Sequence, residues 1–234
     1  MRLGGLQKIS TLDYPSLICA VIFTQGCNFT CPFCHNPDLV PPFGYSENEA
    51  GVLDFLNRRR DLLDAVVISG GEPTEQPDLK FFLKKIRALG YLIKLDTNGS
   101  NPEAVAELIS LGLVDYLALD IKTDPANYPS IMADQKLAKC IAKTIALIKR
   151  LKIAAEFRTT CVSPFVDEKA ILSIAQAASG EAPLFLQRYR GERVLNPNFM
   201  ALYPNQPDDQ ALIRFRDLAL PYLPCLIRDA PEGG

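Results

Sequence analysis

The segment Leu17-Ile-Cys-Ala-Val-Ile-Phe-Thr24 is a nearly continuous apolar run that leads directly into a cysteine-rich stretch, Gln25-Gly-Cys-Asn-Phe-Thr-Cys-Pro-Phe-Cys-His-Asn36. Such a run is typical of a parallel strand that is covered by helices on both faces. Five similar runs follow, at residues 65–69, 91–96, 116–121, 154–160 and 184–188. Segments with helical features lie at about residues 46–60, 77–89, 102–111, 136–151, 168–178 and 208–219, the first opened by Ser46 and Glu49 as a capping box. This alternation predicts an α/β fold with a parallel sheet, either a partial (β/α) barrel or a doubly wound sheet.

The length and charge of the chain indicate its domain organisation and the kinds of partner to expect. Its 234 residues suit one large domain, which we expect at residues 1–195, with a proline-containing extension at 196–234 packed on the same domain. A net charge of −2 gives no general reason to expect binding of nucleic acid or an anionic membrane. The apolar run at 17–23 is too short to cross a bilayer, and Asp13 and Pro15 interrupt any secretory signal, so we expect a cytoplasmic protein.

Three of the seven cysteines, Cys27, Cys31 and Cys34, lie within eight residues of one another. An odd number, unevenly spread, favours metal binding over a disulfide framework. A cluster of four irons takes four ligands, so three local thiols leave one iron open to another molecule. The alternative is a structural zinc site with His35 as fourth ligand. Because His35 directly follows Cys34, the two would have to bend onto one ion without a spacer, and we favour a hydrogen-bonding role for His35.

Polar residues or glycines follow each of the later predicted strands. They are Gly70, Gly71 and Glu72 after the second strand, Asp96, Thr97 and Asn98 at the third, Asp120 and Lys122 at the fourth, Arg158 at the fifth and Gln187 at the sixth. Any one of these could be a simple turn or a surface ion pair. Since the carboxyl ends of parallel strands share one face, the whole set predicts a site on the same face as the cysteine loop.

The residue types at these strand ends suit an amino-acid-like ligand. Gly70 and Gly71 would let a ligand approach the backbone, and Glu72 could hold a cationic amino group. Lys122 and Arg158 could bind a carboxylate. The carboxylates Asp96 and Asp120 could bind ribose hydroxyls, an ammonium group or a small hard cation.

Together, the cysteine loop and Gly70-Gly-Glu-Pro73 resemble the radical S-adenosylmethionine superfamily. The longer stretch Phe23–Pro37 is similar to the activating enzymes of glycyl-radical proteins. Ser10-Thr-Leu-Asp-Tyr-Pro15 and Cys225-Leu-Ile-Arg228 resemble the activating protein of anaerobic ribonucleoside-triphosphate reductase. The similarity covers nearly the whole chain.

The resemblance implies an oxidoreductase with a partial (β/α)6 barrel and a 4Fe–4S cluster on Cys27, Cys31 and Cys34. It would cleave S-adenosylmethionine reductively, with flavodoxin or ferredoxin as electron donor. The 5′-deoxyadenosyl radical would then take hydrogen from a glycine of a partner, expected to be anaerobic ribonucleoside-triphosphate reductase. Two alternatives stay open: a radical enzyme acting on a small molecule, like 7-carboxy-7-deazaguanine synthase, or a non-catalytic zinc or iron–sulfur module.

The resemblance also implies roles for individual residues. The pocket would place Phe33 near adenine, with Gly70, Gly71 and Glu72 at the methionyl amino group. It would be completed by Asn36, Asn98, Lys122 and Arg158. Asp96, Thr97 and Asp120 match a monovalent-cation site, and Asp13 would face the glycyl peptide. Tyr14-Pro15-Ser16 departs from the glycine-rich turn of pyruvate formate-lyase activators, and no second cysteine-rich insert follows Asn36.

Overall fold

The computed structural model describes residues 1–40, 47–126, 128–129, 132, 134–151, 153–191 and 193–228. The chain forms two compact units. The first unit comprises Met1–Asn28, Asn36–Thr97 and Glu103–Leu117. The second comprises Phe29–His35, Asn98–Pro102 and the chain from Ala118 onward. The cysteine loop is therefore divided, with Cys27 in the first unit and Cys31 and Cys34 in the second.

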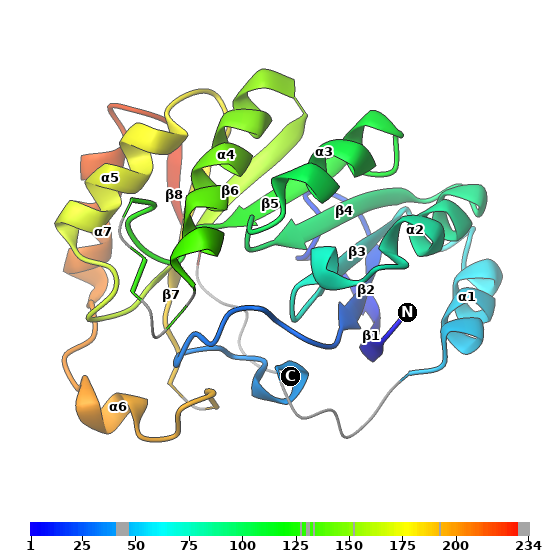
Figure 1. The fold of residues 1–234 in the computed structure, drawn as a ribbon, viewed down its shortest axis with the longest axis horizontal. Helices are drawn as coiled ribbons and strands as arrows, with labels where there is room; N and C mark the ends of the chain where they lie inside the picture. Colours follow the sequence, from blue (N-terminus) through cyan, green and yellow to red (C-terminus); the bar gives the residue numbers. More distant parts are fainter. Residues whose placement is uncertain are drawn as a thin grey trace. The chain divides into compact units, whose positions relative to one another are not determined.

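The first unit is built on four strands, β1 (Leu3–Ser10), β2 (Cys19–Thr24), β3 (Ala65–Gly70) and β4 (Leu92–Thr97). β2, β3 and β4 pair in parallel, whereas β1 pairs antiparallel with β2. The helices α1 (Glu49–Arg58), α2 (Leu79–Ala88) and α3 (Pro102–Ser110) follow β2, β3 and β4 in the chain, as the ribbon in Figure 1 shows. Short 3-10 turns, η1 (Pro37–Leu39) and η2 (Pro73–Glu75), follow β2 and β3.

The local sequence explains where α1 begins and which face of α2 is buried. Asn48 begins α1, because its side chain accepts a hydrogen bond from the backbone N–H of Ala50. The apolar face of α2, at Leu79, Phe82, Leu83 and Ile86, is buried, and this helix packs on β4.

The central strands of the first unit are buried on both faces. In β3, the residues from Ala65 to Ile68 are fully buried. One face of β2 and β3 packs against Tyr14, which comes from the connection between β1 and β2 and lies among Cys19, Val21, Ala65 and Val67. This connection, residues 11–18, therefore fills one face of the sheet with the ring of Tyr14 and places Asp13 beside it.

The second unit contains β6 (Ala154–Cys161), β7 (Leu184–Arg188) and β8 (Cys225–Arg228), which pair in parallel in that order. Its helices are α4 (Gln135–Leu151), α5 (Glu168–Ala178), α6 (Phe199–Leu202) and α7 (Asp209–Ala219). α5 packs on both α4 and α7, and α7 packs on β7 and β8. The strand β5 (Tyr116–Asp120) contains the boundary between the two units.

The sequence predictions of the secondary structure are confirmed for all six expected strands and all six expected helices, within about three residues at most ends. Ser46, expected to open the first helix, lies outside the described residues. The α/β class and the mostly parallel sheet are confirmed, and the fold is consistent with a partial barrel. Two strands were not predicted, β1 and β8, and the antiparallel β1 corrects the expectation of a strictly parallel sheet. The expected extension from residue 196 contributes α6, α7 and β8 to the second unit.

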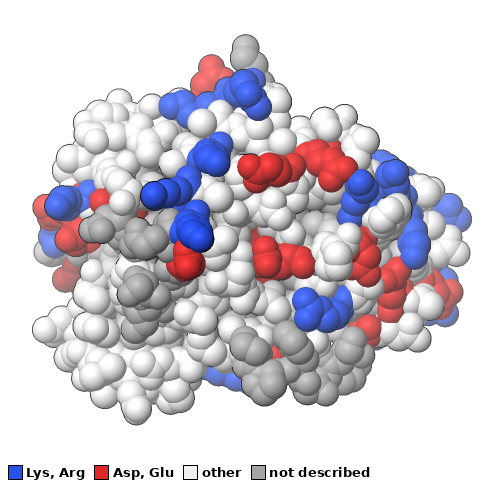
Figure 2. Space-filling view, in the orientation of Figure 1, with Lys and Arg blue, Asp and Glu red and all other residues white. Residues whose placement is uncertain are grey.

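On the face shown in Figure 2, positive and negative side chains are interspersed. Exposed ion pairs such as Lys80–Glu107, with 2.6 Å between nitrogen and oxygen, contribute about 0–1 kcal/mol each. The buried strands therefore supply most of the stability. Among the described helices, none combines the length and apolar character that crossing a membrane requires.

Candidate active site

The backbone that leads into Cys27 is held by several hydrogen bonds within the first unit. The N–H of Gly26 donates to the carbonyl of Leu39 at 2.7 Å, and the carbonyl of Gly26 accepts from the N–H of Glu72 at 2.7 Å. The side-chain amide of Gln76 donates to the carbonyl of Gln25 at 2.6 Å. Residues 25–26 are thus tied to the segment after β3, which fixes where the cysteine loop leaves β2.

Gly70 and Gly71 are required by this close approach of backbone to backbone. A Cβ on Gly71 would lie 2.0 Å from the carbonyl oxygen of Gly26, and one on Gly70 would lie 2.3 Å from the nitrogen of Thr24. Gly70 also has a positive φ of 114°, which L side chains rarely adopt. From the sequence, these glycines are predicted to allow a ligand to approach the backbone. The structure gives them a second reason, packing against the chain just before Cys27, and the contact with a ligand stays a prediction.

Glu72 is 1% exposed and lies directly after these glycines. Its Oε1 accepts three hydrogen bonds: from the N–H of Thr74 at 3.1 Å, from the hydroxyl of Thr74 at 2.7 Å and from the hydroxyl of Thr97 at 2.7 Å. The structure therefore brings together Glu72 and Thr97, two residues predicted from separate strand ends. Its neighbours fix the carboxylate in one orientation, as a binding group for an amino function requires.

Asp96 and Asp13 both contact Lys94, which was not predicted as a site residue. The ammonium of Lys94 lies 3.1 Å from Oδ1 of Asp96 and 2.6 Å from the carbonyl oxygen of Asp13. The side chain of Asp13 accepts a short hydrogen bond of 2.5 Å from Ser10. Lys94 is 1% exposed, within an otherwise apolar strand. A lysine two residues before an aspartate in a buried strand was the available signal, since residues i and i+2 share a face.

The second unit holds the other half of the cysteine loop by backbone hydrogen bonds. Cys34 donates its N–H to the carbonyl of Cys31 at 3.0 Å, which closes a turn between the two thiols. The carbonyls of Pro32 and Cys34 accept from Asn196 at 2.9 Å and from Leu195 at 3.1 Å. Leu195 and Asn196, at the boundary between the expected domain and its C-terminal extension, thus support the loop.

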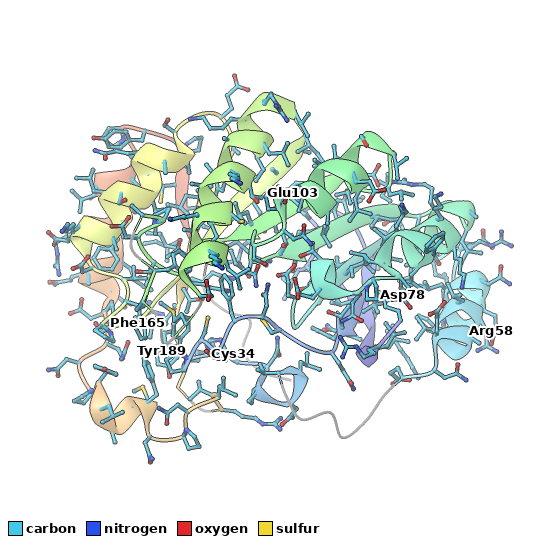
Figure 3. All side chains as sticks on the ribbon, viewed as in Figure 1. Cys34, Arg58, Asp78, Glu103, Phe165 and Tyr189 are labelled. Atoms are coloured by element: carbon cyan, nitrogen blue, oxygen red, sulfur yellow. The ribbon has the colours of Figure 1, made fainter. Side chains whose placement is uncertain are left out.

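Phe33 and His35 both contact aromatic side chains of the second unit. Phe33 is 3% exposed and packs on Phe165, with 5.5 Å between ring centroids. The ring of His35 lies 5.6 Å from that of Tyr189, and its Nε2 is 2.7 Å from the carbonyl oxygen of Arg190. Since a carbonyl can only accept, Nε2 is the donor. Figure 3 labels Cys34, Phe165 and Tyr189 in this part of the second unit. His35 thus makes a hydrogen bond to the backbone of Arg190, and its role beside a bound metal stays a prediction.

Asp120, Lys122 and Arg158, which the sequence placed at two strand ends as separate ligand-binding residues, form one ion-paired group. Arg158 binds both oxygens of Asp120, at 2.7 and 3.2 Å, and the ammonium of Lys122 lies 3.1 Å from Oδ2. Burial acts to raise the pKa of Asp120, but the charges of Arg158 and Lys122 outweigh it and hold that pKa well below its usual range. Burial acts to lower the pKa of Lys122, and the charge of Asp120 outweighs it, so that pKa is raised.

Two further residues, Glu156 and Arg228, extend this ion-paired group, and neither was predicted as a site residue. Glu156, 1% exposed, lies 3.8 Å from Arg158 and accepts two hydrogen bonds from Arg228, at 3.3 and 3.1 Å. The guanidinium of Arg228 also lies 3.7 Å from the centroid of the Phe185 ring. A glutamate inside an apolar strand was the available signal, because a buried carboxylate needs a charged partner.

Asn98 and Asn36 have local roles in the structure. The side chain of Asn98 accepts from the N–H of Ser100 at 2.9 Å, which closes a turn. The carbonyl of Asn36 accepts from Leu39 at the start of η1. Their predicted part in binding a cofactor stays a prediction.

The three thiols fit an iron–sulfur cluster in their chemistry. All are free cysteines, and thiolates are the usual ligands of such clusters. Burial raises the pKa of Cys31 to about 12, an effect that the charge of Lys122 partly offsets, so binding a metal would release the thiol proton. Within the described part of the chain, no three Cys, His, Asp or Glu side chains are gathered as a ready metal-binding group. The ligand assignment therefore rests on the sequence.

Comparisons with known proteins agree with this chemistry. The profile of the radical SAM superfamily matches residues 21–177. A Methanocaldococcus jannaschii protein that carries the provisional name of a glycyl-radical enzyme activating enzyme is 32% identical over 233 residues, which cover 94% of this chain and 92% of that one. A pyruvate formate-lyase-activating enzyme of Listeria monocytogenes is 33% identical over 132 residues, 52% of this chain and 53% of its own.

A solved structure shares the fold. Streptococcus suis SuiB bound to S-adenosylmethionine superposes with a TM-score of 0.68 at 15% identity, over 89% of this chain and 49% of SuiB. This chain thus spans about half the length of SuiB. The matches to the superfamily profile and to a relative over nearly the full length of both chains establish the family. The chain belongs to the radical SAM superfamily, which uses a 4Fe–4S cluster and S-adenosylmethionine, and within it to the glycyl-radical enzyme activating enzymes.

Proposed function

We propose that this protein is an activase that generates a glycyl radical on a partner enzyme. The observation that carries the proposal is a loop with three thiols, one short of a complete iron–sulfur ligand set, in a chain that aligns over 94% of its length with a relative named as such an activating enzyme. When bound, the cluster supplies the electron that cleaves S-adenosylmethionine, and the adenosyl fragment accepts hydrogen from glycine. The protein binds and orients these groups and excludes water.

In this proposal, Cys27, Cys31 and Cys34 hold the cluster. The oriented carboxylate of Glu72 takes the amino group of the methionyl part. The cationic side chains of Lys122 and Arg158 attract the carboxylate of the methionyl part, although both also pair with Asp120. Phe33 lies near the adenine.

We further propose anaerobic ribonucleoside-triphosphate reductase as the partner, with flavodoxin or ferredoxin as electron donor. The supporting features are Ser10–Pro15 and Cys225–Arg228. In the structure, Asp13 lies in the connection that covers one face of the first unit's sheet, where Tyr14 is buried. Asp13 is held beside that face by Ser10 and Lys94, a placement that suits the recognition of an extended peptide.

The cluster assignment is tested by anaerobic reconstitution. Cys31→Ala is expected to lose most of the bound iron and sulfide, whereas Cys140→Ala, a control on α4 in the same unit, is expected to keep both. Electron paramagnetic resonance of the reduced wild type should show a cluster signal that shifts when S-adenosylmethionine is added. Zinc in place of iron, or an unshifted signal, would contradict the proposal and favour the non-catalytic module.

The partner is tested by mixing the reduced activase and S-adenosylmethionine with the candidate reductase. The expected product is the doublet signal of a glycyl radical, absent when the reductase carries alanine at the radical glycine. Cleavage of S-adenosylmethionine without a doublet on the reductase would contradict this partner. A doublet on another glycyl-radical enzyme would keep the activase function and change its substrate, while turnover of a small molecule alone would favour the deazaguanine type of reaction.

A further inference from the structure

The ammonium of Lys94 is buried, and it contacts the kinds of oxygen atom that bind small cations in proteins. Its nitrogen lies 2.6 Å from the carbonyl oxygen of Asp13, 3.1 Å from a carboxylate oxygen of Asp96 and 5.9 Å from the centroid of the Tyr116 ring. The side chains of Lys94 and Asp96 are only 2% and 9% exposed. Carbonyl and carboxylate oxygens are the groups that hard cations bind, and an aromatic face also attracts a cation.

Strand geometry explains why the lysine reaches these partners. Lys94 and Asp96 are two residues apart in β4 and therefore point to the same face of the sheet. Lys94 pairs in register with Val67 of β3, and Val67 packs on Tyr14 in the same face. The connection between β1 and β2 thus passes over the lysine and presents the carbonyl of Asp13 to it.

The monovalent cation expected from the resemblance, at Asp96, Thr97 and Asp120, does not fit these contacts. In the first unit, Asp96 is paired with Lys94, and the hydroxyl of Thr97 donates to Glu72. In the second unit, Asp120 is held by both Arg158 and Lys122. Each carboxylate therefore already has a positive partner from its own unit.

We propose that Lys94 is a built-in cation of this protein, which neutralises Asp96 and anchors the carbonyl of Asp13 in place of a bound monovalent metal ion. The protein then binds S-adenosylmethionine and folds without a specific requirement for sodium or potassium. Lys94 is a positioning residue, since it acts through Asp96 and through the segment that carries Asp13. The part of the inference that concerns S-adenosylmethionine rests on the proposed function, and the part that concerns cation binding does not.

The first test uses wild-type protein without cluster or ligand. Its thermal unfolding midpoint is measured in sodium, potassium and choline chloride at equal ionic strength, and 23Na line broadening reports bound sodium directly. The midpoints are expected to agree within about 1 °C, with no saturable broadening. A midpoint several degrees higher in sodium or potassium, or saturable broadening, would overturn the proposal. This test is independent of the radical reaction.

The second test uses Lys94→Met, which keeps the length of the side chain but removes its charge. This variant is expected to unfold at a lower temperature and to regain part of the loss in sodium or potassium but not in choline. Lys94→Met combined with Asp96→Asn should show no such rescue, and Lys80→Met, at an exposed ion pair in the same unit, should behave as wild type. If Lys94→Met does not fold in any salt, the measurement on the wild type still shows whether the protein binds a monovalent cation.

The third test measures the affinity of the reconstituted wild type for S-adenosylmethionine in the same three salts. The dissociation constants are expected to agree within twofold. A tenfold weaker constant in choline would overturn the proposal. Absence of binding in every salt would instead contradict the proposed function and leave the result on the cluster-free protein standing.

Discussion

The close approach of Gly71 to Gly26 makes a sharp prediction about how the cysteine loop is positioned. We expect Gly71→Ala to destabilise the protein and to lower its capacity for iron. The added Cβ would lie 2.0 Å from the carbonyl oxygen and 2.6 Å from the carbonyl carbon of Gly26. Both atoms belong to the backbone, so the strain cannot be relieved by rotation of a side chain.

The magnitude follows from the contacts that must give way. An ordinary contact between carbon and oxygen needs more than 3 Å, so the backbone of Gly26 has to move by about 1 Å or more. That movement strains two hydrogen bonds of Gly26, its N–H to Leu39 and its carbonyl from Glu72, each 2.7 Å long. Overpacking costs about 1–3 kcal/mol, and two hydrogen bonds of about 1 kcal/mol each are weakened but not broken, so we expect a loss of about 3 kcal/mol.

The assay is thermal unfolding of the metal-free protein, followed by iron and sulfide analysis after anaerobic reconstitution. A loss of about 3 kcal/mol corresponds to roughly 6–12 °C in the unfolding midpoint for a chain of this size. Since the displaced residue directly precedes Cys27, the iron content should fall as well. The matched control is Gly51→Ala in α1, where the nearest atom to the new Cβ is 3.9 Å away. It should stabilise the protein by about 0.5–1 kcal/mol.

Two outcomes would refute this reasoning. If Gly71→Ala unfolds within about 1 °C of wild type, the backbone contact does not exist as described. If the variant is destabilised but takes up a full complement of iron, the contact supports the fold without positioning the cysteine loop.

Three further predictions follow from the buried charges. Glu72→Gln keeps an oxygen that can accept the hydrogen bonds of its neighbours, so fold and iron content should persist. The affinity for S-adenosylmethionine, measured by anaerobic calorimetry, should weaken tenfold or more, since a hydrogen bond to a charged group contributes about 1.5–3 kcal/mol. Unchanged affinity would show that Glu72 does not bind the ligand. Arg158→Met should destabilise the protein by about 2 kcal/mol at pH 7, a value discounted for the partial exposure of Asp120. Because the folded-state pKa of Asp120 is depressed, its stabilisation is present above the unfolded pKa near 4 and is lost as the pH falls further; the difference from wild type in urea unfolding should therefore shrink below about pH 4, and a constant difference would contradict the ion-pair explanation. Arg228→Lys loses the paired hydrogen bonds and the stacking on Phe185 and should lower the unfolding midpoint by roughly 2–8 °C, for about 1–2 kcal/mol, with no change in iron content. A midpoint equal to that of wild type would show that the pair contributes nothing.

The sequence determined the secondary structure of the central strands because hydrophobic periodicity is a local property. β1 escaped prediction because Gly4 and Gly5 weaken its apolar pattern and its residues 7–9 are exposed. β8 is only four residues long, and its pairing with β7 gives it a strand conformation.

For the candidate site, the sequence alone determined the cysteine spacing and the residue types at the strand ends, because both are properties of short, continuous segments. Only the tertiary structure decided which charges meet. Lys94 reaches the carbonyl of Asp13 across 81 positions in the chain, and Arg228 reaches Glu156 across 72. The need for glycine at position 71 likewise comes from Gly26, which approaches it through the pairing of β2 with β3. Contacts between distant segments depend on strand register and on which face a side chain occupies, and these are set by the packing of the whole sheet.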